Sequence, residues 1–189
     1  MRGATPARRW LPAVAVLVVL TMATFGGFVV STALSEPAGP PVSIAGVVSV
    51  QPLSGWEPAE AGEVAERPIV RITRGSGTLA VVAWGSVPGD SESLAADVVD
   101  ELLRDQLDRL TVSELLTTVR LDEGLEAQRF TFVGIDRTTN AAVEGEVTTV
   151  VAPGGEGVIF VGVAPEGLLA FVDGDLHTMI AAASLGAPA

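Results

Sequence analysis

The chain of 189 residues contains no cysteine. Disulfides, thiolate metal sites, cysteine nucleophiles and a lipid anchor on an N-terminal cysteine are therefore excluded. Lysine is also absent, so all 11 basic residues are arginine; this pattern is typical of G+C-rich coding sequences, and we infer no chemistry from it. Histidine occurs once, at His177. Any hydrolase or metal site that needs an imidazole must use this residue.

Positive charge is scarce after the N-terminus. All 23 acidic residues lie at or beyond Glu36, together with eight of the 11 arginines, so this part of the chain carries a formal charge of −15. A field of this sign repels phosphate backbones and anionic lipid. We therefore expect no nucleic-acid partner, and a basic partner or simple solubility is the more natural explanation.

Charge is absent from residues 10–35. Within this segment, the apolar run of residues 11–34 exceeds the ~20 residues that a helix needs to cross ~30 Å of hydrocarbon. Three arginines precede the run and no basic residue follows until Arg67. The positive-inside tendency therefore predicts a cytoplasmic head of residues 1–10, a single-pass signal-anchor in the cell membrane, and an extracytoplasmic domain.

Two alternatives concern the same apolar segment. Ala33, Leu34 and Ser35 have the small-residue spacing of a signal-peptidase site, although the apolar run is longer than the ~7–15 residues typical of cleaved signal peptides. Retention as an anchor is therefore favoured over a secreted product. Small residues four apart, which let membrane helices approach closely, also allow a weak homodimer; they are Ala23, Gly27 and Ser31.

The remaining chain is long enough for one compact domain with one core. Residues 35–41 are a Pro-rich linker, residues 42–185 are the predicted domain, and residues 186–189 are a disordered tail. Hydrophobic residues make up 48% of the chain and charged residues 18%, a composition too apolar for intrinsic disorder. We expect the domain to fold.

The clearest helical pattern covers residues 91–110, where Asp90 or Ser91 is a suitable N-cap. Its apolar residues recur at helical spacing, and acidic residues occupy the other face. Alternating or β-branched runs separated by turn residues predict strands; they cover residues 46–51, 69–73, 78–86, 115–121, 125–133, 143–152 and 157–163. A closing helix begins near residue 168 or 175 and ends near 185. The fold class is α+β, with an antiparallel sheet of about six or seven strands covered by two helices.

Two short segments of the domain sequence resemble those of a known family. A strand ends in Pro52 before Gly55-Trp56, and residues 160–165 (FVGVAP) lead to a closing helix that contains Met179. Over residues 42–185 the chain resembles the PsbP/LpqN-type sandwich of bacterial envelope proteins and a lumenal photosystem subunit. The resemblance implies a sheet covered by helices and a largely non-enzymatic binding or assembly role, with no catalytic motif to transfer. The lipobox cysteine of the lipid-anchored members is missing here.

Two groups of residues are candidates for chemistry. A shared metal site is one interpretation of three residues that alternate along the chain, Asp173, Asp175 and His177. At a helix start, however, the carboxylates more simply cap free backbone amides. Residues two apart on a helix also point to different faces. A Ser-His-Asp hydrolase would need His177 as its base, but this chain has no Gly-x-Ser-x-Gly elbow to present a nucleophile. Glu144 and Glu146 alternate with apolar residues, which predicts a solvent-facing strand edge.

Two further groups are predicted to be structural. The acids of residues 57–66 recur every third position without the ligand spacing of known calcium loops, and predict a solvated loop. The aromatic residues of the domain are predicted to be core residues; they are Trp56, Trp84, Phe130, Phe132, Phe160 and Phe171. A shallow apolar groove between the sheet and the closing helix would make them a ligand site instead.

We therefore predict a membrane-anchored, extracytoplasmic binding or accessory protein of the bacterial envelope that is not an enzyme. No residue is assigned as catalytic, cofactor-binding or metal-binding. The expected partner is a protein or an envelope ligand such as a wall component or lipid, in addition to the membrane itself. The alternative is a secreted hydrolase or metal-binding domain centred on His177.

Overall fold

The computed structural model describes residues 39–59, 61–121 and 124–186. These residues belong to one compact unit. The predicted head, the predicted span, most of the linker, and the small-residue stripe at Ala23, Gly27 and Ser31 lie outside them. Among the described residues, no helix has the length and apolarity needed to cross a membrane.

The long helix begins where the sequence predicts. Asp90 is its N-cap and accepts a hydrogen bond from the Ser93 backbone N–H at 2.9 Å; bonds from this N–H and from the Ser93 hydroxyl hold the pKa of Asp90 below its usual value. The helix is α2 (Ser91–Asp97), a π-helical segment η1 (Val98–Leu103) and a last turn α3 (Arg104–Gln106). In η1 the Arg104 N–H bonds the Val99 carbonyl, five residues back.

The helix ends at Gln106, so its predicted end at residue 110 was wrong. Leu107 and Leu110 belong to strand β7 (Leu107–Val112), which pairs with β9 (Glu126–Asp136). Their spacing fitted a helical repeat by coincidence. Leu107 still contributes to the core, because its side chain is buried on the same face of the sheet as the helix.

The main sheet has nine strands in the described part of the chain, all antiparallel, in the order β3-β5-β6-β11-β10-β9-β7, with β4 beside β5 and β8 beside β9. The strands not yet introduced are β3 (Glu57–Pro58), β4 (Gly62–Val64), β5 (Arg67–Arg74), β6 (Gly77–Ser86), β8 (Thr117–Arg120), β10 (Ala142–Val151) and β11 (Glu156–Pro165). Gly75 and Ser76 form the tight turn between β5 and β6, as the sequence predicts.

A second, three-stranded sheet has the order β1-β2-β12. Its strands are β1 (Val42–Ile44), β2 (Val48–Val50) and β12 (Ser184–Leu185), and the short turn η2 (Leu169–Phe171) precedes the closing helix α4 (Asp173–Ala181). The strand count therefore exceeds the predicted six or seven. Strands of two or three residues are too short to show a period of two.

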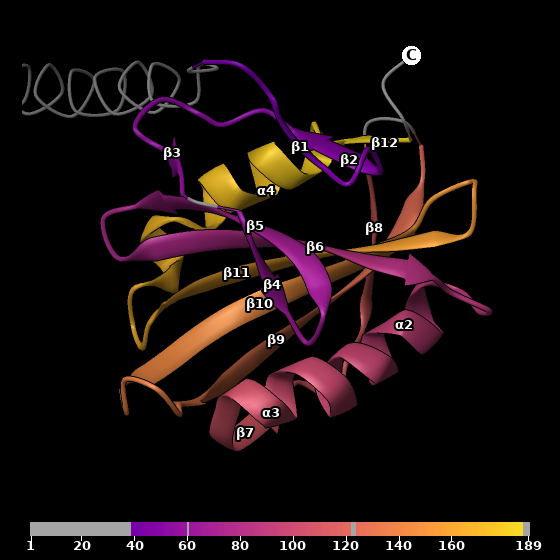
Figure 1. Cartoon of the computed structure of the whole chain (residues 1–189). Coiled ribbons are helices and arrows are strands. Elements are labelled where there is room, and N and C mark those ends of the chain that lie inside the picture. The colour runs from indigo at the N-terminus through magenta and orange to yellow at the C-terminus, as the bar shows by residue number, and fades with distance from the viewer. Residues whose placement is uncertain (1–38, 60, 122–123, 187–189) are drawn as a thin grey trace, which may run out of the picture. The chain divides into compact units, whose positions relative to one another are not determined.

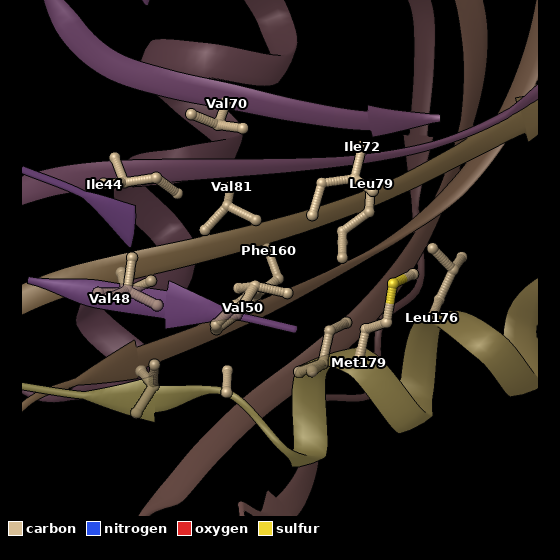
Figure 2. Close-up of a cluster of buried hydrophobic side chains, with 14 of the residues drawn as sticks. Ile44, Val48, Val50, Val70, Ile72, Leu79, Val81, Phe160, Leu176 and Met179 are labelled. Atoms are coloured by element: carbon tan, nitrogen blue, oxygen red, sulfur yellow. The ribbon is translucent and has the colours of Figure 1, made fainter. Parts of the chain in front are cut away.

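The domain has three layers. The helix α2–α3 covers one face of the nine-stranded sheet, and α4 covers the other face (Figure 1). The α4 side holds the larger core, in which side chains from the sheet, the small sheet and α4 meet (Figure 2). Gly162 on β11 lets α4 approach, because a Cβ there would lie 2.6 Å from the Leu176 side chain.

Candidate functional site

An apolar pocket lies between the sheet and the helix α2–α3, and we call it the helix-side pocket. Its volume is about 140 Å³. The helix side contributes Leu102, Leu103 and Gln106. The sheet and its edges contribute Val64, Ile69, Arg71, Ala80, Val82, Leu107, Phe132, Asp136, Val143, Val161 and Val163. Eleven of these fourteen residues are hydrophobic, so the pocket favours an apolar occupant.

The π-helical segment forms part of the lining of this pocket. In a π-helix each turn holds more residues than in an α-helix, and such segments are frequent at functional sites. Leu102 and Leu103, two consecutive residues of η1, both lie in the pocket wall. Both leucines belong to the apolar face that the sequence predicts for the helix of residues 91–110.

Gly145 keeps the Phe132 side of the pocket in place. A Cβ at this position would lie 2.5 Å from Cζ of Phe132 and 2.4 Å from the Gly162 carbonyl oxygen. The Phe132 ring therefore lies against the bare backbone of β10, its cross-strand neighbour at this position. Any side chain at residue 145 would displace the ring.

Three polar side chains line the pocket, namely Arg71, Gln106 and Asp136. Asp136 ends β9 and accepts bonds from the backbone N–H groups of Thr138 and Thr139 and from the Thr139 hydroxyl. These bonds, the Thr139 N–H foremost, hold the pKa of Asp136 below its usual value. The carboxylate is therefore ionised at neutral pH.

The face of the sheet beneath the closing helix is a packed core, and the alternative of a groove there was wrong. Trp56 and Phe160 are buried there, as the sequence predicts, together with Leu176 and Met179 of α4. The sheet face toward α4 is thus filled, and the helix-side pocket lies on the opposite face. Phe130 and Phe132 are also buried as predicted, but on that opposite face.

Two of the six aromatic residues depart from the core prediction. Phe171, the last residue of η2, is 76% exposed. Trp84 is half-buried, and the Arg67 guanidinium stacks 3.5 Å from the centre of its ring. Arg67 is itself paired with Glu101 at 2.8 Å, so this contact links β5 and β6 to the long helix.

His177 contacts Glu146, a pairing that the sequence does not predict. Nε2 of His177 lies 2.8 Å from Oε2 of Glu146, and Arg129 approaches the same oxygen at 3.9 Å. With Glu146 as a carboxylate, which only accepts hydrogen bonds, the imidazole donates through Nε2. Oε1 of Glu146 is buried without a hydrogen-bond partner in the described structure.

The predicted solvent-facing edge at Glu144 and Glu146 was wrong for Glu146, which is only 5% exposed. Strand β10 lies between β9 and β11 and is therefore interior. Glu146 lies on the α4 side of the strand, where His177 of α4 reaches it. Glu144 is half-buried and accepts the Leu169 backbone N–H at 2.7 Å.

Asp173, Asp175 and His177 do not converge. Asp175 accepts the indole N–H of Trp56 at 2.9 Å and pairs with Arg74, which fixes α4 to the first strands. Asp173 accepts the neighbouring Gly174 N–H at 2.6 Å. The N-cap of α4 is Val172 and no side chain caps the helix start, so the predicted capping by Asp173 or Asp175 was wrong. No group of three His, Asp or Glu side chains suited to a metal occurs in the described part of the chain.

The acidic segment of residues 57–66 is exposed, as predicted. Glu57, Glu63 and Glu66 are exposed, and the neighbouring strands β3 and β4 lie beside β5 at the edge of the sheet. Glu60 lies outside the described residues. The segment is therefore partly extended rather than a plain loop.

Known proteins resemble this chain in structure rather than in sequence. No protein-family model and no curated protein sequence matches it. Among solved structures, it is similar to cyanobacterial PsbP (CyanoP) from Synechocystis sp. PCC 6803, with a TM-score of 0.53 and 10% identity over 77% of this chain and 91% of that chain. It is also similar to LpqN of Mycobacterium tuberculosis, a protein involved in cell envelope biogenesis, with a TM-score of 0.50 and 14% identity over 81% and 90% of the two chains.

The domain has a PsbP/LpqN-like fold. The fold-level resemblance inferred from the sequence phrases is confirmed. At 10% and 14% identity the likeness concerns the fold alone, because one fold hosts many unrelated functions. Function must therefore be argued from the site.

Proposed function

We propose that this protein is an accessory binding protein of the bacterial envelope, anchored by residues 11–34, whose extracytoplasmic domain holds a short aliphatic group in the helix-side pocket. The observation that carries the proposal is the pocket itself, an opening of about 140 Å³ with hydrophobic side chains at most of its lining positions. The similarity in fold to LpqN, a protein involved in cell envelope biogenesis, supports the envelope setting by analogy.

The pocket volume limits the size of the ligand. An engineered apolar cavity of about 150 Å³ holds benzene, which has six carbons. A pocket of about 140 Å³ therefore accommodates about six carbons, either a short chain or the end of a longer one. Burial of six methylenes contributes roughly 5 kcal/mol before the cost of association, so an isolated six-carbon ligand binds weakly, with a Kd no tighter than about millimolar.

We also propose that the domain does not catalyse a reaction. The single imidazole is hydrogen-bonded to the buried Glu146 on the α4 side of the sheet, away from the helix-side pocket. The described residues place no serine or threonine hydroxyl in hydrogen-bond contact with His177. A nucleophile–base pair needs such a contact.

The pocket is tested by filling it. Ala80 is half-buried on β6 and lines the pocket, so Ala80→Leu inserts three carbons into a space for about six. We expect the full chain in lipid nanodiscs to keep or raise its melting temperature, as cavity-filling substitutions commonly do. Binding of 1-hexanol, measured by equilibrium dialysis with empty nanodiscs subtracted, should fall below detection.

The matched control is Ala181→Leu, a half-buried alanine on α4 that does not line the pocket. This variant should bind 1-hexanol as the unmodified chain does. Unchanged binding by a folded Ala80→Leu protein would show that the helix-side pocket is not the ligand site.

A further inference from the structure

The lining of the helix-side pocket contains an arginine that has no carboxylate within 4.0 Å among the described residues. Six arginines of the domain have a carboxylate within 4.0 Å; they are Arg67, Arg74, Arg104, Arg120, Arg129 and Arg137. In the described part of the chain, Arg71 and Arg109 have none. Of these two, only Arg71 lines the pocket.

The position of Arg71 gives the pocket a polar end. Its backbone lies in β5, opposite Ala80 of β6, and the residue is exposed while also lining the apolar space. Arginine stems pack along apolar surface while the guanidinium stays in water. A ligand chain inside the pocket therefore meets a positive group at this side.

The opposite side has the opposite charge. Asp136 ends β9, and β5 and β9 are separated by three strands, which at ~4.8 Å per strand step places their backbones about 19 Å apart across the sheet. The carboxylate of Asp136 is ionised, since its pKa is held low by the Thr139 and Thr138 bonds. An anionic group is attracted at Arg71 and repelled at Asp136, so an anionic ligand has one favoured orientation in the pocket.

Resting on the proposed function, we propose that the ligand is an aliphatic carboxylate, with its chain in the helix-side pocket and its head group paired with the Arg71 guanidinium. A guanidinium presents two parallel N–H donors that match the two oxygens of a carboxylate. The strongly acidic domain repels anions at long range. Selection for a carboxylate therefore rests on this local contact rather than on the net charge.

The test compares hexanoate with 1-hexanol, which share the chain and differ in the head group. With the full chain in nanodiscs at neutral pH, equilibrium dialysis should show hexanoate binding about fivefold more tightly than 1-hexanol, the ratio expected for a partly exposed ion pair. Arg71→Gln should abolish this preference, so that hexanoate binds this variant no more tightly than 1-hexanol does. Arg109→Gln, which changes the other unpaired arginine away from the pocket, should retain the preference.

Each result separates the two proposals. Equal binding of hexanoate and 1-hexanol, or a preference that survives Arg71→Gln, would overturn the carboxylate assignment and leave the apolar pocket standing. Absence of binding by both ligands would overturn the pocket function and this assignment together. Loss of 1-hexanol binding in Arg71→Gln would show that Arg71 shapes the pocket rather than recognising a charge.

Discussion

At the residue scale, the most unusual feature is the buried carboxylate of Glu146. A buried charge is tolerated when it is paired and hydrogen-bonded. Here His177 supplies the closest bond and Arg129 a longer approach, while Oε1 has no partner in the described structure. The His177 side chain is 40% exposed, but its removal would leave the buried Glu146 side chain without its closest hydrogen-bond partner.

We predict that His177→Ala destabilises the domain by about 1–3 kcal/mol, because a buried carboxylate loses its nearest donor. In a double-mutant cycle with Glu146→Gln, the two positions should show a coupling energy of at least about 0.5 kcal/mol. Chemical denaturation of the full chain measures both quantities. Thr178→Ala, at the exposed neighbouring position on α4, should change stability by about 0.5 kcal/mol or less.

The same variant separates a structural histidine from a catalytic one. If His177 only supports Glu146, His177→Ala at a temperature where it is folded should bind 1-hexanol normally and complement a deletion strain. A protein that melts normally but fails to complement would instead favour the hydrolase or metal-binding alternative.

At the element scale, the long helix carries both the core and the pocket. Leu103 is 4% exposed and lines the pocket. We predict that Leu103→Asp unfolds the domain, because an unpaired buried charge costs several kcal/mol, a large part of the stability of a domain this size. Thermal melting followed by circular dichroism should show loss of the cooperative transition.

Ala96→Asp is the control for this helix, since Ala96 is exposed on α2. Its cost should be about 1 kcal/mol or less, from helix propensity and nearby like charges. Similar melting of the Leu103→Asp variant and the unmodified chain would mean that this side of the helix does not face the sheet.

The helix also illustrates what the sequence predicts and what it does not. Its start is predictable because Asp90 is a local N-cap, and the β5–β6 hairpin is predictable from its two-residue turn. Its end is not, since Leu107 begins a strand whose partner lies about 30 residues further along the chain. Edge strands of two or three residues, such as β3 and β12, are defined only by their partners.

The candidate site was less predictable than the fold, because its residues are also brought together from positions far apart in the sequence. The helix-side pocket combines residues from the helix and from strands far apart in sequence, and the π-helical turn depends on hydrogen bonds rather than on residue spacing. Glu146 and His177 are 31 residues apart. Alternation of acidic and apolar residues along β10 could equally mean an exposed edge or one buried carboxylate with a partner.

At the scale of the whole molecule, the predicted topology places the acidic domain outside the cytoplasm. The absence of cysteine from the chain allows a direct test by single-cysteine labelling. Ser76→Cys, in the exposed β5–β6 turn, should react with a membrane-impermeant maleimide on intact spheroplasts, because the positive-inside tendency places the domain outside. Labelling would be followed by mass shift.

Thr5→Cys in the predicted cytoplasmic head is the matched control and should react only after lysis. The reverse pattern, with residue 5 labelled in intact spheroplasts and residue 76 protected, would contradict the orientation. Recovery of a soluble product that begins near Glu36 would contradict the anchor and favour a cleaved signal peptide.

Intermolecular nuclear Overhauser effects show whether an aliphatic group occupies the helix-side pocket. The measurement uses the full chain with labelled methyl groups in deuterated lipid nanodiscs, and a protonated six-carbon ligand. We expect contacts from the ligand chain to the methyl groups of Leu102, Val161 and Val163, which line the pocket. Contacts confined to Leu176 and Met179 beneath α4, or no contacts to the domain at all, would contradict it.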